Sequence, residues 1–400
     1  MINIDVERLD INYLINDERV LTNIINKPVL KIFDDSVIDF LDSLSKKILN
    51  EGKEYTDLIS FGFWIRKSNI LNIYKKYSTS NRLGRGIIFH IAPSNVPLNF
   101  AYSLVCGLLS GNTNIVKISS KEFSQVLLLI KLMKETLCFF PEINLKIFII
   151  QYKNQKEVTD YFSSIANVRI IWGGDKTISN IRKSELPSYG KEICFFDRYS
   201  FLLINAEDYL EEKNKKLIAN RFYNDTYLND QNACTSPKLL VWYFDDEKIL
   251  ENAKKIFWNE LHLLVKEKYE IQPIQIMDKL VKEYIIFSEG IDGFSENIYS
   301  NSLMTIIDIK ELNSDILKMN YNSGFFLQYE TKKINDIISL CQRKTQTLAT
   351  YGFDNEEVRK MLMENGVWGI DRVVKLGETL NFDVLWDGYD LILELSREIG

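Results

Sequence analysis

Short apolar runs alternate with helix-length amphipathic stretches through the middle of this 400-residue chain. Four of the runs have the composition of buried strands: "GIIFHIA", "TNIVKIS", "LKIFIIQ" and "VRIIW". The stretches between them, such as "SKEFSQVLLLIKLMKETLCFF", carry apolar residues at helical spacing. Strands that alternate with helices of this length predict a parallel sheet with helical crossovers, as in α/β nucleotide-binding domains.

The alternation predicts three parts along the chain. Residues 1–80 are expected to form a mainly helical segment, residues 81–206 a first α/β block, and residues 207–400 a second. The C-terminal end of the chain is expected to belong either to the second block or, by returning, to the first. Because no linker rich in Pro, Gly or Ser separates the blocks, we expect them to interleave.

Composition excludes several classes of function. The formal net charge is -6, which gives no support to binding of nucleic-acid phosphates or to a polybasic membrane anchor. The start of the chain lacks the basic and apolar regions of a secretory signal. The longest apolar stretch falls short of the ~20 residues that a membrane-spanning helix needs. A cytoplasmic protein is therefore expected.

Cysteine and histidine usage narrows the chemistry further. Five cysteines without a CxxC pair predict neither a disulfide framework nor a zinc site, and we expect no metal. The two histidines, His90 in an apolar strand and His262 in a helix, are interpreted as structural. A hydrolase built on a histidine base is therefore disfavoured.

Three positions stand out as candidates for chemistry. Asn95, between the prolines of "IAPSNVPLNF", is either a preorganised hydrogen-bond donor or an ordinary turn residue. Lys117 ends a predicted parallel strand, at the edge where open α/β sheets bind ligands. Cys234 lies in the polar loop "DQNACTSP", and its local sequence fits a nucleophile or a structural thiol equally well.

A family resemblance distinguishes between these readings. The boxes "PSNVP", "GNTNIVKISS", "WGG", "QNACTSP" and "WDGYD" occur in an order that resembles the acyl-CoA reductase family of the LuxC type. This family is a branch of the aldehyde dehydrogenase superfamily. The resemblance covers roughly residues 80 to 400. It implies an aldehyde-dehydrogenase-like fold of two interleaved α/β domains with parallel sheets and a helical N-terminal segment.

The resemblance assigns catalytic roles to two residues. Cys234 aligns with the nucleophile of the superfamily. Asn95 aligns with the amide that completes an oxyanion hole together with the backbone N–H of the cysteine. Each such donor contributes about 3 kcal/mol to stabilising a tetrahedral intermediate.

The resemblance also implies a nicotinamide dinucleotide held by residues 81–206. Lys117 aligns with the lysine that binds the adenosine ribose, and Ser119 and Ser120 follow it. Gly173 and Gly174 fall where the superfamily places its pyrophosphate-facing turn. A glutamate often occupies the position of Ser120 in members that prefer NAD, so NADPH is the expected cofactor.

One departure bears on the type of reaction. Hydrolytic aldehyde dehydrogenases use a glutamate as a base for water, and its expected position here is near Pro187, with Glu185 close by but out of register. We therefore expect reduction of a fatty acyl thioester to the aldehyde through an acyl-cysteine. The donor is acyl-CoA or an acyl group from a partner acyl-protein synthetase. Homo-oligomers are common in the superfamily.

Two alternatives stay open at this point. One is a hydrolytic aldehyde dehydrogenase that oxidises an aldehyde to an acid. The other is an acyltransferase that forms the cysteine thioester without hydride transfer.

Overall fold

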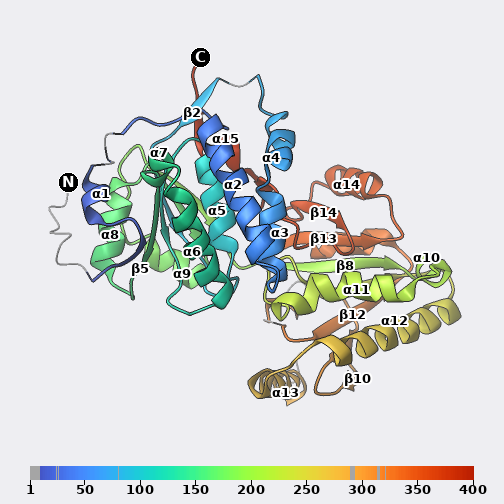
Figure 1. Cartoon of the computed structure of the whole chain (residues 1–400). Helices are drawn as coiled ribbons and strands as arrows, with labels where there is room; N and C mark the ends of the chain where they lie inside the picture. Colours follow the sequence, from blue (N-terminus) through green and yellow to red (C-terminus); the bar gives the residue numbers. More distant parts are fainter. Residues whose placement is uncertain are drawn as a thin grey trace. The chain divides into compact units, whose positions relative to one another are not determined.

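The computed structural model describes residues 10–400 except 24, 26, 80, 289–292, 313–315 and 320. The chain divides into two compact units (Figure 1). One comprises the residues up to Phe196 together with Val384–Gly400, and the other comprises Asp197–Asp383.

The first unit is built on a sheet in which the described strands run in the order β1-β5-β4-β3-β6-β7. All neighbouring pairs are parallel except β1 and β5. The strand bounds are β1 (Asn12–Ile15), β3 (Ile87–Ile91), β4 (Thr113–Lys117), β5 (Ile147–Gln151), β6 (Val168–Trp172) and β7 (Lys191–Phe195). The strands β3 and β6 are mostly apolar and are buried along their whole length, as expected for a sheet covered on both faces.

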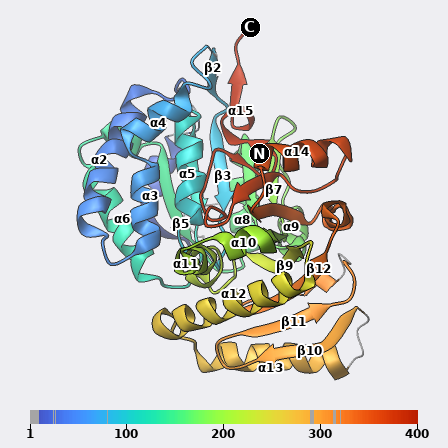
Figure 2. The same ribbon diagram turned by 90° about the vertical axis from the view of Figure 1, so that its right-hand side faces the viewer.

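Helices cover both faces of this sheet. One face packs against α1 (Glu18–Thr22), α8 (Lys156–Ile165) and α9 (Asp175–Ile181), which share a buried cluster with Phe89, Phe148 and Phe162. Figures 1 and 2 show α5 (Asn99–Leu109) and α6 (Ser124–Leu137) on the opposite side from α8. The predicted parallel sheet with helical crossovers is confirmed.

Among its described residues the N-terminal segment is mainly helical, as predicted, and also contains a strand. It forms α2 (Asp35–Glu51), α3 (Thr56–Trp64) and α4 (Lys67–Tyr74), and α2 packs against α6 of the same unit. Residues Asn12–Ile15 instead form β1, an antiparallel edge strand on β5. The expectation of helix was wrong for these residues, because pairing with β5 supplies hydrogen bonds that the local sequence does not reveal.

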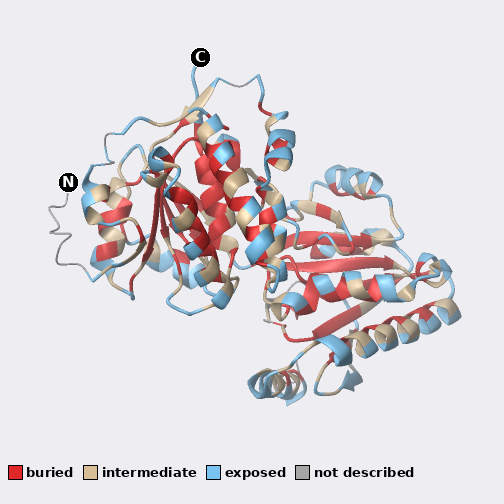
Figure 3. Ribbon diagram, in the orientation of Figure 1, coloured by how far each residue is buried: buried red, intermediate tan, exposed pale blue. Residues whose placement is uncertain are grey.

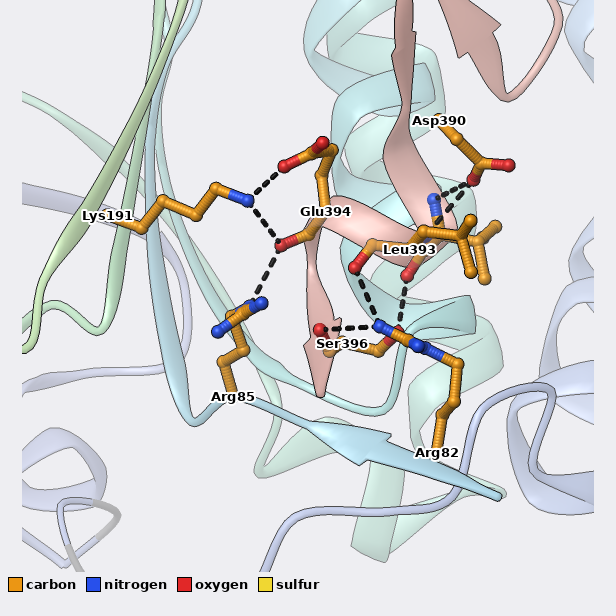
Figure 4. Close-up of polar contacts among 8 residues, drawn as sticks. Arg82, Arg85, Lys191, Asp390, Leu393, Glu394 and Ser396 are labelled. Atoms are coloured by element: carbon orange, nitrogen blue, oxygen red, sulfur yellow. Dashed lines mark hydrogen bonds and ion pairs between the residues drawn. The ribbon is translucent and has the colours of Figure 1, made fainter. Parts of the chain in front are cut away.

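The C-terminal segment completes the first unit (Figure 4). Its helix α15 (Leu391–Glu394) leads into β17 (Ser396–Glu398), which pairs with β2 (Arg82–Gly84). Arg82 donates from Nε to Ser396 Oγ at 2.7 Å, and Arg85 donates to the Glu394 carbonyl at 2.9 Å. Lys191 of β7 forms an ion pair with the Glu394 carboxylate. These contacts join the end of the chain to strands formed far earlier in the sequence.

The "WDGYD" box is a tight hairpin that precedes this segment. Leu385–Trp386 (β15) pairs with Tyr389–Asp390 (β16) across a two-residue turn. Asp387 and Gly388 have φ of 50° and 76°, the positive values that a type I′ turn requires. The Tyr389 ring meets the edge of Phe195 at 5.8 Å, so the hairpin packs beside β7.

The second unit is built on a sheet whose described strands run in the order β10-β11-β12-β9-β8-β13-β14. Only β10 is antiparallel to its neighbour among these described pairs. The strand bounds are β8 (Tyr199–Asn205), β9 (Pro237–Tyr243), β10 (Phe294–Ser300), β11 (Thr305–Ile309), β12 (Phe325–Thr331), β13 (Thr345–Tyr351) and β14 (Arg372–Lys375). The central strands are buried in Figure 3.

Helices also cover both faces of the second sheet. One face packs against α10 (Ala206–Glu211), α11 (Lys215–Thr226) and α12 (Glu247–Lys268) around Trp242 and Phe257. The other face packs against α13 (Pro273–Ser288) and α14 (Asn355–Glu364). The strand "SFLLIN", which we placed in the first block, is β8 and pairs with β9 and β13.

Candidate active site

The order of the strands in the first unit creates a ligand-binding edge. From β3 the chain moves through β4 to β5 on one side, and then returns to place β6 on the other side of β3. The order reverses between β3 and β6, and open α/β sheets bind ligands at the carboxyl ends of strands at such a point. The "PSNVP" loop follows β3, and Gly173 and Gly174 follow β6. The sequence candidates of this unit therefore meet at the ligand-binding edge of the sheet.

Lys117 is the last residue of β4 and lies opposite Ile91 of β3 in the sheet register. Its ammonium stands 4.6 Å from the centre of the Tyr152 ring, and burial lowers the pKa of Lys117. Ser119 is half-buried, and its carbonyl accepts a hydrogen bond from Gln151 at 2.7 Å. Ser120 is exposed. A cation and an exposed hydroxyl thus lie on one short loop at this edge.

The loop after β3 presents Asn95 at the surface. Asn95 is exposed between Pro93 and Pro97, and α5 begins two residues after the second proline. Asn99, the first residue of α5, has a buried amide oxygen to which no described residue donates a hydrogen bond. An unsatisfied buried acceptor in this position suits a ligand hydroxyl or amide. Sequence reasoning did not single out Asn99.

The "WGG" box joins the end of β6 to α9. Gly173 donates from its backbone N–H to Phe195 at 3.0 Å, and a Cβ on Gly173 would lie 3.1 Å from Thr177 Cγ2. Gly174 is the N-cap of α9, and the first helical residue is Asp175. Because a carboxylate there repels an anion, phosphate binding directly at the start of α9 is disfavoured. The two glycines keep the turn close to the strand edge.

His90 serves the packing of this unit, as predicted. It is fully buried in β3, with Nδ1 2.8 Å from Ser103 Oγ and Nε2 3.0 Å from Asn114 Oδ1. Trp172 also donates to Ser103 Oγ, at 3.2 Å. The network joins β3, β4, β6 and α5. Burial lowers the pKa of His90 to about 4.

Cys234 lies in the second unit, in the loop between α11 and β9. It is half-buried, and its carbonyl accepts a hydrogen bond from Ser200 Oγ at 2.7 Å. The N–H of Thr347 donates to the same Ser200 oxygen at 3.1 Å. The cysteine is thereby fixed at the amino ends of β8, β9 and β13.

The loop is braced at its start as well. Asp230 and Gln231 both have positive φ, at 51° and 59°, and the buried Gln231 side chain closes the turn. Its amide donates to the carbonyls of Pro237 at 2.9 Å and Phe325 at 3.1 Å, and its oxygen accepts from Gly324 N–H at 3.1 Å. These bonds preorganise the backbone around the thiol.

Two cations border this loop. Lys238, in β9, donates to the Gln231 carbonyl and is almost fully buried. Lys282, on α13, donates to Asn322 Oδ1 at 2.5 Å, and Asn322 donates to Asn232 Oδ1 at 3.4 Å. Sequence reasoning missed both lysines, since only the folded loop brings them near Cys234.

The remaining cysteines differ from Cys234 in their surroundings. Cys106 is buried in α5, and burial raises the pKa of Cys341 to about 12. Burial and the Glu192 carboxylate raise the pKa of Cys194 to about 11. Cys138 is exposed and its thiol lies 3.4 Å from the Lys134 carbonyl. Among these thiols, Cys234 is the one on a braced loop.

Glu185 and Pro187, near the position expected for a water-activating base, lie between α9 and β7 of the first unit. Glu185 is exposed, and the Pro187 carbonyl accepts a hydrogen bond from Gly190 N–H at 2.7 Å. The structure thus places Asn95, Lys117, Ser119, Ser120, Gly173 and Gly174 in one unit. It places Cys234 in the other.

Neither a cluster of metal ligands nor a membrane-spanning helix is found among the described residues. No group of three or more His, Cys, Asp or Glu side chains there is arranged to hold a metal ion. None of the described helices combines the length and apolar character needed to cross a membrane.

The chain has a mixed α/β fold with parallel sheets that matches the folds of aldehyde dehydrogenases. The chain belongs to the family described as "Acyl-CoA reductase (LuxC)", whose model matches residues 69–398.

Several known proteins are similar to this chain in sequence or in fold. A long-chain acyl-protein thioester reductase of Vibrio harveyi is 22% identical over 301 residues, which cover 73% of this chain and 59% of that protein. Glyceraldehyde-3-phosphate dehydrogenase GapN from Methanocaldococcus jannaschii, complexed with NADP, matches with a TM-score of 0.64 and 16% identity. This match covers 95% of the present chain and 91% of the GapN chain. A Thermus thermophilus 1-pyrroline-5-carboxylate dehydrogenase matches at 0.63 with 12% identity, covering 95% and 82%.

Proposed function

We propose that this protein reduces a fatty acyl thioester to the aldehyde with NADPH, by way of an acyl group on Cys234. The Cys234 thiolate attacks the thioester carbonyl, the carrier thiol leaves, and the acyl-cysteine forms. Asn95 and the backbone N–H of Cys234 act as the two donors to the carbonyl oxygen. The acyl donor is acyl-CoA or an acyl-protein, as the name of the Vibrio relative suggests.

The observation that carries this proposal is the braced loop around Cys234. A nucleophilic thiol needs partial exposure, a fixed backbone and positive charge nearby. Cys234 is half-buried, its loop is closed by the Gln231 side chain, and Lys238 donates to that loop. The pKa values of Cys194 and Cys341 are raised to about 11 and 12, so these two thiols form very little thiolate near neutral pH.

The first unit has residues that fit a nicotinamide dinucleotide. We assign the binding of ribose hydroxyls to Lys117, at the carboxyl end of β4, and to the unsatisfied amide oxygen of Asn99. The bound cofactor supplies the hydride. Ser120 offers a hydroxyl donor in place of a carboxylate, and Lys121 adds a positive charge, which together favour a 2′-phosphate. We assign the unit that contains residues 81–196 to cofactor binding, together with the Asn95 donor, and the unit of Asp197–Asp383 to the Cys234 nucleophile.

The decisive test is NADPH consumption with acyl-CoA esters of increasing chain length, together with identification of the aldehyde. Cys234→Ser should abolish both aldehyde formation and transfer of a radioactive acyl group to the protein. Cys138→Ser, which changes the exposed cysteine, should keep both. Label on any cysteine other than Cys234 would refute the assignment of the nucleophile.

Cofactor choice has a separate test at Ser120. Ser120→Glu should shift preference towards NADH, because a carboxylate repels the 2′-phosphate and accepts from ribose hydroxyls. We expect at least a tenfold change in the ratio of kcat/KM values, about 1.4 kcal/mol. Ser120→Ala, which removes the hydroxyl without adding charge, is the matched control. A strong NADH preference in the unmodified protein would assign the choice to other residues.

A further inference from the structure

Lys238 is a buried cation that ties together the two ends of the Cys234 loop. It is the second residue of β9, is 5% exposed, and donates a hydrogen bond to the main-chain carbonyl of Gln231. Gln231 precedes Cys234 by three residues and Lys238 follows it by four. The ammonium group therefore links the residue that follows the loop to the residue at its start.

The charges that act on Lys238 come from two places, the Cys234 loop and α13. No ion pair with a carboxylate involves Lys238 in the part of the chain that the structure describes. Burial lowers the pKa of Lys238 to about 7, a negative charge on Cys234 opposes this, and the Lys282 ammonium reinforces it. Because the interaction is mutual, a protonated Lys238 favours the thiolate form of Cys234.

Holding the loop closed does not by itself require a charge. The neutral amide of Gln231 already closes the same turn, with bonds to the carbonyls of Pro237 and Phe325. A buried ammonium without an anionic partner is costly compared with a neutral donor in the same place. Lys238 therefore keeps a positive charge near neutral pH most readily when a negative charge forms next to it.

We propose that Lys238 is a positioning residue for acylation, which holds the Cys234 loop through the Gln231 carbonyl and stabilises the cysteine as a thiolate. The thiol proton leaves to solvent, and the thiolate attacks the thioester carbon as the carrier thiolate departs. Lys282 is half-buried on α13, and its positive charge lowers the pKa of Lys238. It therefore reduces the fraction of Lys238 that is protonated. The inference rests on the proposed role of Cys234 as the nucleophile.

The test is the pH dependence of Cys234 alkylation by iodoacetamide in the full chain, followed by peptide mass spectrometry to separate it from the other cysteines. In the unmodified protein the rate should reach half its maximum well below pH ~8.5, the ordinary pKa of a thiol. Lys238→Gln keeps a hydrogen-bond donor but removes the charge, and should raise this midpoint by about one unit or more. Lys238→Arg should restore it.

Lys279→Met is the matched control. Lys279 is also buried, donates to a carbonyl (Ser302, 2.8 Å) and has its pKa lowered to about 8 by burial. The charged groups that act on it are Glu283 and Lys282, not Cys234. Its replacement should leave the alkylation profile of Cys234 unchanged.

Three outcomes decide the matter. If the Lys238→Gln protein folds and its Cys234 alkylation has the same midpoint pH as in the unmodified protein, the proposed role of the Lys238 charge is overturned. If that variant does not fold, a midpoint at or above pH ~8.5 in the unmodified protein overturns it equally. If the midpoint shifts as expected but acyl-CoA does not label Cys234, the effect of Lys238 on the thiol stands and the proposed function fails.

Discussion

Asn95 and Cys234 depend on their own loops in different ways. Cys234 is held by Ser200, whose hydroxyl donates to the cysteine carbonyl, whereas Asn95 is exposed between two prolines that restrict the backbone. The restricted backbone limits the positions that the Asn95 amide can take. This is the property an oxyanion hole needs, and it leads to a prediction about turnover.

Asn95→Ala should lower turnover by about a hundredfold or more with little change in cofactor affinity, since an oxyanion donor acts mainly on the transition state. Single-turnover rates and a cofactor titration measure the two effects separately. Ser94→Ala, at the neighbouring exposed position, is the control and should keep full turnover. Weaker cofactor binding with unchanged turnover would make Asn95 a structural loop residue.

Because His90 is buried, we expect the folded protein to lose stability in mild acid. Burial lowers its pKa to about 4 from the ordinary 6.5, so between these values the unfolded chain binds a proton that the folded protein excludes. The free energy of unfolding should therefore fall as pH drops from about 6.5 to 4, by about 2 to 3 kcal/mol from this group. Asp225 acts in the opposite direction, because burial raises its pKa to about 6 and folding then favours its protonation.

Comparing a variant with the unmodified protein separates these two groups. His90→Gln removes the titrating ring and leaves Asp225 in place. Urea unfolding at pH 7 and pH 5 should show a smaller loss of stability in the variant, whatever its absolute stability. Parallel losses in the two proteins would show that His90 does not govern the acid response.

At the scale of elements, the hairpin of "WDGYD" depends on a positive φ at Gly388. Gly388→Val places a β-branched residue at φ 76° and should lower the free energy of unfolding of the first unit by about 2 kcal/mol. Gly388→Asn should cost clearly less, because asparagine tolerates the left-handed region. The urea midpoints of the two variants measure the difference. Equal losses would attribute the effect to crowding instead of backbone conformation.

The strands β3 to β6 of the first sheet could be predicted because each carries its own signal. The runs that form β3, β5 and β6 are mostly apolar, which is the pattern of strands covered on both faces. The strand β1 could not be predicted, since "NYLI" is short and its partner β5 lies far along the chain. The contacts of the C-terminal segment with Arg82 and Lys191 likewise join residues that lie far apart in the sequence, so no local pattern reveals them.

The candidate site shows the same division between local and long-range information. Cys234, Asn95 and Lys117 could be proposed because their loops carry recognisable boxes of sequence. Lys238 and Ser200 could not, because a lysine or serine in a strand has no local feature that reveals which loop it contacts. Their bonds to Gln231 and Cys234 exist only once β8 and β9 pair.

At the scale of the whole molecule, the fate of the acyl-enzyme separates a reductase from a hydrolytic dehydrogenase. A positioned carboxylate base would speed hydrolysis of the acyl-cysteine by about a hundredfold to ten-thousandfold. The position expected for that base is near Pro187, which has no proton-accepting side chain, and Glu185 is exposed on the same loop. The acyl-enzyme should therefore persist until a hydride or a thiol reaches it.

Incubation with an aldehyde, NADP and CoA should accordingly yield mainly the acyl thioester, with little free acid. With acyl-CoA and no cofactor, the acyl-enzyme should accumulate, and an added thiol should regenerate a thioester. Chromatographic analysis of both mixtures measures this partition. Glu185→Gln is the matched control and should leave it unchanged, because an exposed Glu185 out of register activates no water. Free acid as the main product, reduced in Glu185→Gln, would instead identify Glu185 as a base and place the chemistry with the hydrolytic dehydrogenases.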